Sequence, residues 1–177
     1  MPTSYKHRAV RPFWQALAVF LLSFFALQLA WNHAHGTRLE HWIIDCATVR
    51  TSVALINRLT PQAAAVARGP SILAPDGGIN VRNGCEGTEI LFLLMAALVA
   101  YPFSWRMRLA GMAAGAVYVF LINQVRLLAL FYSLRNDRTL FDQLHGTVAP
   151  LLLILCTLIF FVALRNWSLR PRADTRG

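Results

Sequence analysis

Three residues of the chain, Cys85, Arg126 and His145, together have the side chains needed for acyl transfer. A thiolate is a strong nucleophile, a histidine can take its proton and later protonate a leaving amine, and a guanidinium can stabilise an oxyanion or lower the thiol pKa. Each residue also has a structural interpretation. A buried cysteine is an inert packing group, an interfacial histidine is often only a surface residue, and a membrane arginine can pair with Asp142 or Glu89 to hold helices together.

The cysteine lies in a short polar segment, residues 83–89, directly before the apolar run from Ile90 to Phe103. Gly84 and Gly87 flank it, so backbone can approach the thiol closely. A cysteine at the point where an aqueous segment meets a membrane helix is an unusual placement. The elements around this segment therefore decide between catalysis and packing.

The composition is that of an integral membrane protein. The 177 residues are 56% hydrophobic and only 14% charged, which is too apolar for a soluble domain of this size. The 17 Lys and Arg residues exceed the 8 Asp and Glu residues, but they cluster between apolar runs rather than on one face of a soluble fold. We therefore predict an all-α membrane protein whose environment is the lipid bilayer, with no nucleic-acid partner.

Four apolar runs approach the roughly 20 residues that cross a hydrocarbon core as a helix. They are residues 13–31, 88–103, 109–134 and 147–164. The second is short, which suggests that its Cys85 end dips into the headgroup layer. We expect a basic tail (1–12), a first membrane helix (13–31), an extracytoplasmic segment (32–87), a core of three membrane helices (88–164) and a second basic tail (165–177).

Charge asymmetry predicts the orientation. The two tails and the loop at residues 104–108 hold nine basic residues against the single acidic residue Asp174. By the positive-inside rule both termini are cytoplasmic, and the segments 32–87 and 135–146 face outward. A cleaved signal peptide ending near Ala34 is a competing interpretation. The first apolar run is longer than a usual signal sequence, and its exit lacks a small-residue cleavage site.

The outer segment contains a predicted amphipathic helix from His41 to about Leu59, closed by Pro61 and lying along the membrane surface. Its apolar face is expected to hold Trp42, Cys46, Val49, Val53 and Ile56, while Asp45, Thr48, Ser52 and Arg58 point elsewhere. Cys46 and Cys85 both lie on the oxidising side, where a disulfide would make Cys85 structural. Because Cys46 falls on the apolar face, we expect Cys85 to stay a free thiol.

A short β-hairpin is predicted over residues 68–82. The apolar pairs around residues 72–73 and 79–81 flank Pro75-Asp76-Gly77-Gly78, a strong turn signal. The exposed edge of such a hairpin could take an extended peptide as an added strand. The alternative is a loop that only connects two helices.

The third membrane helix carries two features. Gly111 and Gly115 form a small-xxx-small face that lets another helix approach closely. Asn123 and Arg126, three residues apart, share one helix face, and Arg126 is about 26 Å from the cytoplasmic end at 1.5 Å per residue. The predicted topology therefore brings Cys85, Arg126 and His145 to the outer side. A closed zinc site needs four ligands, and the outer cysteine and histidine residues lack ligand-pair spacing, so we expect no metal and no cofactor.

The motifs Asn83-Gly84-Cys85-Glu86-Gly87, Asn123-Gln124-Val125-Arg126 and His145 resemble, in order, the Cys, Asn-x-x-Arg and His motifs of the exosortase/archaeosortase family. The similarity covers roughly residues 68–164, and the compact size resembles the short exosortases of the exosortase H type.

This resemblance implies a multi-pass cysteine transpeptidase of the bacterial inner membrane, with its active site on the outer face. Its substrates would be secreted proteins with a C-terminal sorting signal, cleaved through an acyl-enzyme and passed to an acceptor that the resemblance does not identify. Cys85 would be the nucleophile, Arg126 the substrate-orienting or oxyanion-stabilising residue and His145 the general acid/base. Asn123, Glu89 and Asp142 would support them, while the charge of Glu86 would oppose thiolate formation unless Arg126 or Arg82 offsets it.

Two other functions stay open from the sequence. A non-catalytic membrane assembly factor or transporter subunit would use Arg126 for packing. An intramembrane protease would form the same acyl-enzyme but pass it to water, and the sequence does not separate hydrolysis from transfer.

Overall fold

The computed structural model describes residues 12–75, 77–81 and 85–170 of the chain, and most of them are helical. Three helical stretches within these ranges are long and apolar enough to cross a membrane: α1 (Phe13–Ala34), α5 (Trp105–Asn136) and the continuous helix Arg138–Leu169. A fourth apolar helix, α4 (Thr88–Ala100), has only 13 residues. The predicted all-α membrane protein is confirmed, with the second helix short as expected.

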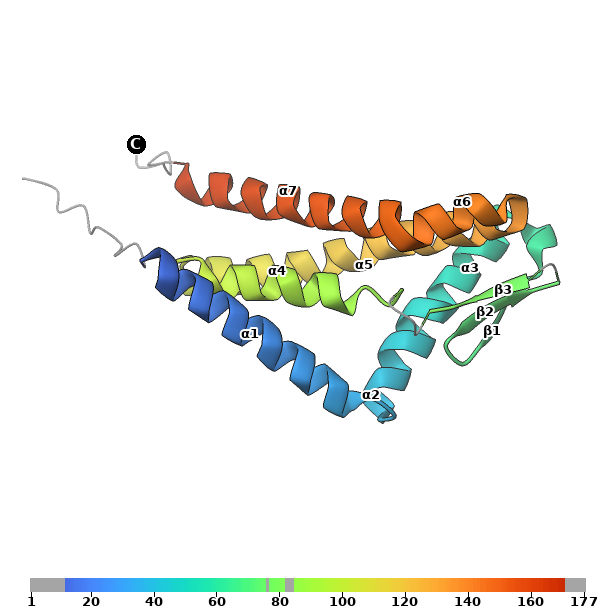
Figure 1. The fold of residues 1–177 in the computed structure, drawn as a ribbon, viewed down its shortest axis with the longest axis horizontal. Helices are drawn as coiled ribbons and strands as arrows, with labels where there is room; N and C mark the ends of the chain where they lie inside the picture. Colours follow the sequence, from blue (N-terminus) through green and yellow to red (C-terminus); the bar gives the residue numbers. More distant parts are fainter. Residues whose placement is uncertain (1–11, 76, 82–84, 171–177) are drawn as a thin grey trace, which may run out of the picture.

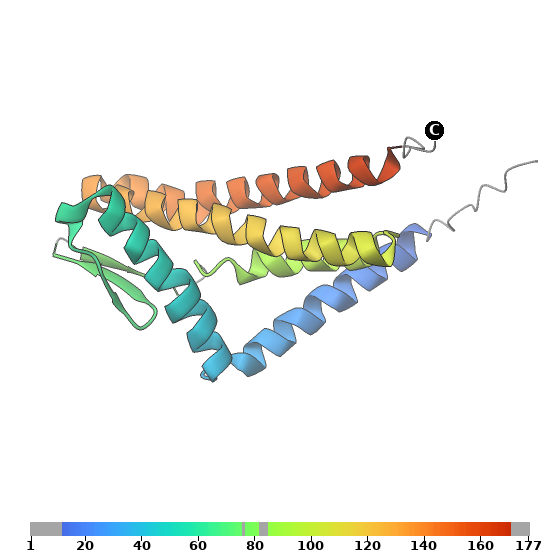
Figure 2. The ribbon, with the colours of Figure 1, turned by 180° about the vertical axis from the view of Figure 1, so that it is seen from behind.

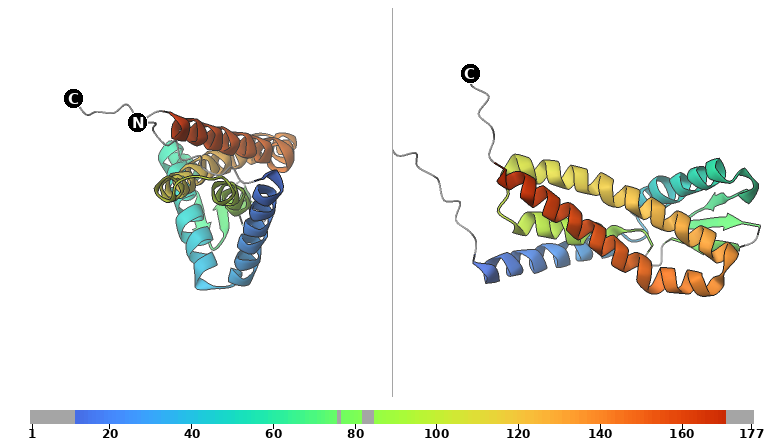
Figure 3. Two further views of the ribbon diagram at one scale, coloured as in Figure 1. Left: turned by 90° about the vertical axis from the view of Figure 1, so that its left-hand side faces the viewer. Right: turned by 90° about the horizontal axis from the view of Figure 1, so that it is seen from above.

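The long helices form an elongated bundle. The start of α1 and the end of α7 (Ala149–Leu169) lie at the same end of the molecule, and the sheet lies at the opposite end (Figures 1 and 3). The apolar window of α1 is not buried by other parts of the protein. Such an uncovered apolar helix needs lipid around it.

Close helix packing in the bundle depends on α4 and on small residues of α5. The α4 helix contacts α1, α5 and α7. A Cβ added at Gly111 would lie 2.6 Å from Leu164 Cδ2 of α7, and one at Gly115 would lie 2.7 Å from Leu94 Cδ2 of α4. The predicted small-residue face is therefore confirmed, and leucines from two neighbouring helices pack against it.

The predicted amphipathic helix is present as three joined pieces, α2 (Arg38–His41), the π-helical η1 (Trp42–Val49) and α3 (Arg50–Leu59). Figure 2 shows α3 leading from the side of the C-terminal end of α1 toward the C-terminal end of α5. The short 3-10 helix η2 (Pro61–Ala63) follows it, so the helix ends before Pro61 as predicted.

The prediction of which side chains of this helix are buried and which are exposed is partly wrong. Val49 and Ile56 are fully buried as expected, but Trp42 is 64% exposed, and Thr48 and Ser52 are buried. A π-helical turn holds more residues than an α-helical turn, so spacing by 3.6 residues misplaces the side chains across η1. Hydrogen bonds compensate for burial of the hydroxyls, which sequence spacing alone does not reveal.

One of these hydroxyls joins α3 to α5. Ser52 Oγ donates to Gln124 Oε1 at 2.7 Å, and both side chains are buried. We expect Ser52→Ala to lower the free energy of unfolding by about 1 to 2 kcal/mol, because the buried amide oxygen loses its donor. Thermal unfolding in detergent measures this, with the exposed Ser168→Ala as the matched control. Equal melting temperatures for the two variants would contradict the prediction.

A three-stranded antiparallel sheet of order β1-β2-β3 lies beside α3 and α5. Its strands are β1 (Val66–Arg68), β2 (Ser71–Ala74) and β3 (Gly77–Asn80). The hairpin predicted from the turn at residues 75–78 is confirmed as β2 and β3, and β1 is a strand that the sequence did not predict. Ile72 and Ile79 pair across the hairpin and join the core next to Phe131.

The connection between α5 and α7 is helical. Asp137 has an extended backbone, and its Oδ1 accepts the backbone N–H groups of Thr139 and Leu140. This caps the start of α6 (Arg138–Gln143). The π-helical η3 (Leu144–Val148) then joins α6 to α7 without interruption, so the predicted fourth membrane helix belongs to a longer helix that begins outside the apolar run.

Candidate active site

A local backbone turn positions Cys85 between β3 and α4. The Cys85 N–H donates to Val81 O at 3.2 Å. Gly87, two residues later, has a left-handed φ of 78° and caps the start of α4. Asn83 and Gly84 of the predicted polar segment lie outside the described residues, as does Arg82. Cys85 itself is 3% exposed.

Asn123 of α5 holds this turn from the other side. Its Nδ2 donates to Cys85 O at 3.0 Å, and the side chain is buried. A Cβ added at Gly87 would lie 2.9 Å from Asn123 Cγ. The asparagine therefore fits only because residue 87 is a glycine, and the pair fixes the cysteine backbone against α5.

We expect Gly87→Ala to destabilise the protein by about 1 to 3 kcal/mol and to displace the cysteine turn, because alanine at this φ is strained. Gly36→Ala is the matched control: Gly36 has a similar φ of 76°, but a Cβ added there would meet nothing within 4 Å. Thermal unfolding should show a larger loss for Gly87→Ala. An equal loss of thermal stability in both variants would show that the contact with Asn123 does not contribute to stability.

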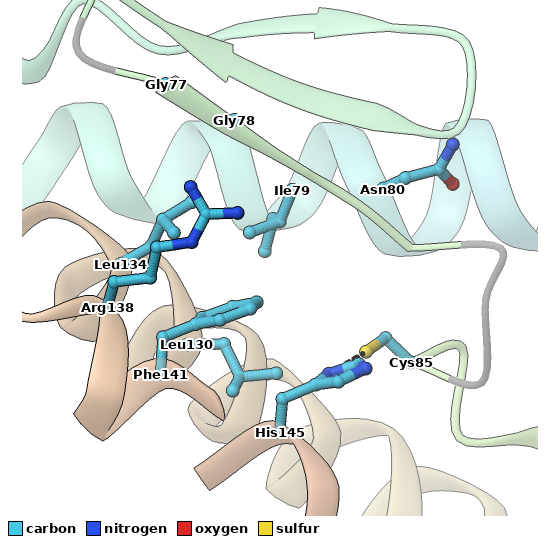
Figure 4. Close-up of a pocket in the computed structure, with 10 residues that line it drawn as sticks. All are labelled: Gly77, Gly78, Ile79, Asn80, Cys85, Leu130, Leu134, Arg138, Phe141 and His145. Atoms are coloured by element: carbon cyan, nitrogen blue, oxygen red, sulfur yellow. Dashed lines mark hydrogen bonds between the residues drawn. The ribbon is translucent and has the colours of Figure 1, made fainter. Parts of the chain in front are cut away.

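His145 lies on η3 and reaches the thiol. Cys85 Sγ and His145 Nδ1 are 3.3 Å apart (Figure 4). The Ala149 N–H donates to Leu144 O, five residues back, and Pro150 follows without an N–H to continue the α-helical pattern. Single π-helical turns of this kind recur at functional sites because they redirect one side chain.

The ring of Phe141 supports the imidazole. The two rings stack with centroids 5.5 Å apart and planes 5° from parallel. Phe141 is four residues before His145, so both project from the same face of the helix. The stacking limits rotation of the imidazole and keeps Nδ1 directed at the thiol.

The cysteine and histidine lie at one end of a groove of about 440 Å³. The strand β3 forms one wall, and residues of α5 and α6, including Leu130 and Phe141, form the other. Figure 4 shows Arg138 and Phe141 extending into the space between α6 and the strand. The site is thus an elongated depression beside a strand rather than an enclosed cavity.

Arg126 is 8% exposed and does not line the groove. With Glu86, Glu89 and Pro150 it lines a separate cavity of about 100 Å³. Its guanidinium is close enough to act electrostatically on Cys85. The structure therefore brings Cys85 and His145 into contact and places Arg126 beside them without making it part of the groove.

The charges around the thiol act in opposite directions. Burial, the largest effect, raises the pKa of the Cys85 thiol, the Arg126 charge lowers it, and the Glu86 carboxylate raises it. The net direction is upward from the ordinary value of about 8.5. At neutral pH the resting group is a thiol, so a base is needed to form the nucleophile, and His145 is in contact.

The other expected residues are placed as follows. Asn123 contacts the cysteine turn. Glu89 and Asp142 are exposed, and among the described residues neither forms an ion pair with Arg126. Cys46 and Cys85 are both free thiols, as expected from the apolar placement of Cys46, so a structural disulfide does not occupy the proposed nucleophile.

The family model described as transmembrane exosortase matches residues 3–162, most of the chain. The chain belongs to the exosortase family. No curated protein and no solved structure matches it. Exosortases are membrane-embedded and act on C-terminal sorting signals, which agrees with the apolar bundle and with the resemblance of the cysteine, Asn-x-x-Arg and histidine motifs.

Sequence reasoning missed two features of this exosortase site. Phe141 could have been found from its spacing of four residues before His145. No local sequence pattern predicts the contact between Gly87 and Asn123, because the two residues are 36 positions apart and meet only when α4 packs on α5.

Proposed function

We propose that this protein is a membrane-embedded cysteine transpeptidase that cleaves the C-terminal sorting signals of secreted proteins through an acyl-enzyme. The observation that carries the proposal is the 3.3 Å contact between Cys85 Sγ and His145 Nδ1 at the end of a groove. A thiol in contact with a base that is itself oriented by a third group is the arrangement of an activated nucleophile.

The reaction begins with proton transfer from Cys85 to His145 Nδ1, in the tautomer whose proton is on Nε2. The thiolate attacks the carbonyl carbon of the scissile peptide bond. As the tetrahedral intermediate collapses, the imidazolium gives its proton to the leaving amine, and a thioester remains on Cys85. An acceptor amine then attacks the thioester carbonyl, and His145 takes the proton of this amine. The C–S bond breaks as the second tetrahedral intermediate collapses, and the imidazolium returns the proton to the Cys85 thiolate, which restores the thiol.

Arg126 assists through charge rather than contact with the groove. Its guanidinium favours the thiolate against the opposing effects of burial and Glu86, and the same positive charge stabilises the oxyanion that follows. We further propose that the groove faces the outer side of the bacterial inner membrane and that both termini are cytoplasmic. The excess of basic residues in the tails and in the loop after α4 supports this orientation.

Capture of the thioester tests the proposed function. The full-length protein in detergent is mixed with a tagged secreted protein from the same genome that carries a C-terminal sorting signal, and the reaction is stopped in acid. We expect a covalent adduct on the peptide containing Cys85, released by hydroxylamine. Mass spectrometry of the product distinguishes transfer to an amine from hydrolysis to a free carboxyl group. Cleavage without any adduct on Cys85 would contradict the proposal.

A further inference from the structure

The strand β3 is an edge of the sheet, and this edge faces α6 across the groove. The sheet order is β1-β2-β3, so β3 pairs with a described strand only on its β2 side. Figure 1 shows β3 as the strand nearest α6. Four consecutive residues of β3, Gly77 to Asn80, line the groove that ends at Cys85 and His145.

The hydrogen-bonding direction of each β3 residue follows from the pairing. The Val81 N–H donates to Pro70 O, so this pair is of the hydrogen-bonded type. Hydrogen-bonded and non-hydrogen-bonded pairs alternate along an antiparallel ladder. The pair Leu73 and Gly78 is therefore non-hydrogen-bonded, and the N–H and C=O groups of Gly78 point away from β2.

The edge is also open to a second backbone. Residues 77 and 78 are glycines and are exposed, so the backbone of this part of the strand is accessible from the groove. An edge strand normally carries charges, a proline or a covering segment that prevents pairing with another chain. These two glycines carry no such side chain, and they line the same groove as the proposed nucleophile.

The groove also has a direction. Figure 4 shows Cys85 at one end of the groove between β3 and α6, and both elements lie at the end of the molecule away from the start of α1 and the end of α7 (Figure 1). The sorting signal that the family resemblance implies has a membrane helix after its short motif, and such a helix has to lie on the bundle side of Cys85. The residues before the scissile bond then extend along the groove.

We propose that the free edge of β3 binds the substrate segment preceding the scissile bond as an added antiparallel or parallel strand, with Gly78 exchanging main-chain hydrogen bonds with it. The ligand is an extended polypeptide recognised through its backbone, and the inference rests on the proposed function. Strand addition would place the scissile carbonyl at Cys85 with a fixed register, since the strand and the cysteine turn are joined to the same core.

Backbone N-methylation of the substrate tests this binding mode. The probes are synthetic peptides covering the cleaved sequence of the processed protein, each with one N-methylated residue before the scissile bond, used with the full-length protein in detergent. An added strand directs alternate N–H groups toward β3. We therefore expect kcat/KM to fall about tenfold or more at alternate positions and less than about twofold at the positions between them.

The outcomes separate the two proposals. If the native protein cleaves the unmodified peptide and Cys85→Ala does not, the proposed function is supported. If, in addition, the N-methyl effects do not alternate along the peptide, strand addition is overturned and the proposed function stands. Equal turnover by the native protein and Cys85→Ala overturns the proposed function, and the inference with it. Alternating effects together with dependence on Cys85 support both.

Photocrosslinking gives an independent measurement. The crosslinking amino acid p-benzoylphenylalanine is placed at position 80 on β3, or at position 66 on β1 as the matched control, because Val66 is exposed on the opposite edge of the sheet. With the tagged substrate protein, we expect an adduct from position 80 that maps before the scissile bond and none from position 66. Equal adducts from both positions, or an adduct only from position 66, would overturn the proposal.

Discussion

Replacing Cys85 with alanine is expected to reduce processing of a co-expressed sorting-signal protein by more than about 10³-fold, to the detection limit. Removing the nucleophile of a catalytic unit costs about as much as removing the whole unit. Among the described residues, Cys85 is the cysteine that lines the groove, and Cys46 and Cys156 lie elsewhere. No other thiol of this part of the chain can therefore replace it. The ratio of cleaved to uncleaved substrate on an immunoblot measures the effect.

Two further variants make this result specific. Cys46→Ala is the matched control, since Cys46 is also a free, partly buried thiol outside the groove, and it should process the substrate like the native protein. Cys85→Ser keeps the size of the side chain but replaces the thiol by a hydroxyl that ionises far less readily, so we expect it to be as inactive as Cys85→Ala. Normal processing by Cys85→Ala would refute the catalytic function.

Replacing His145 with alanine is expected to reduce processing by about 10² to 10⁴-fold, the usual contribution of a positioned general acid/base. Two steps are affected: the thiol loses the base at 3.3 Å, and the leaving amine loses its proton donor. Folding should be retained, because His145 is only half-buried. Initial rates of processing in membranes, normalised to protein amount, measure the loss.

The pH dependence of this variant has a definite sign. Burial raises the pKa of Cys85, so near neutral pH the thiol is mostly protonated. Without His145 the thiolate has to form by direct ionisation, and its amount increases about tenfold per pH unit while the pH is below that pKa. We expect the residual rate of His145→Ala to increase steeply with pH and the native rate to increase less.

The matched histidine control is His41→Ala. His41 is exposed, hydrogen-bonds to Asp45 at 3.1 Å and lies outside the groove, so its loss should leave both the rate and the pH profile unchanged. A His145→Ala variant with the native rate and profile would show that the contact with Cys85 is not used in catalysis.

Local patterns in the chain were sufficient for the membrane elements. Apolar runs of about 20 residues form helices in lipid because every backbone group has to be satisfied within its own segment. The uncharged α1 follows this rule, and so does α5, whose predicted span 109–134 carries the single charged residue Arg126. The glycines at positions 111 and 115 predicted a close helix contact because their spacing places both on one face. The hairpin was predictable from the proline and glycines of its turn.

The same local reasoning failed where the backbone departs from regular spacing or where the partner is distant in sequence. Trp42 was assigned to the wrong face because the π-helical η1 changes the number of residues per turn. The burial of Ser52 has another cause: it shares an α-helical face with Val49 and Ile56, and its hydroxyl donates to Gln124 of α5. The strand β1 is short, and it is stabilised by pairing with β2 rather than by a pattern of its own. Asp142 was one alternative partner of Arg126, but it is exposed and does not line the small cavity that holds Arg126 and Glu89.

The candidate residues of the site could therefore be predicted from residue types and their order, but their arrangement in space could not. Composition, charge distribution and helical spacing are local properties, and they placed Cys85 and His145 at the ends of neighbouring apolar helices. Whether the two side chains meet depends on the π-helical turn before Pro150, the stacking of Phe141 and the fit of Asn123 against Gly87. These contacts join segments up to 60 residues apart, and their geometry is set only when α4, α5 and α7 pack together.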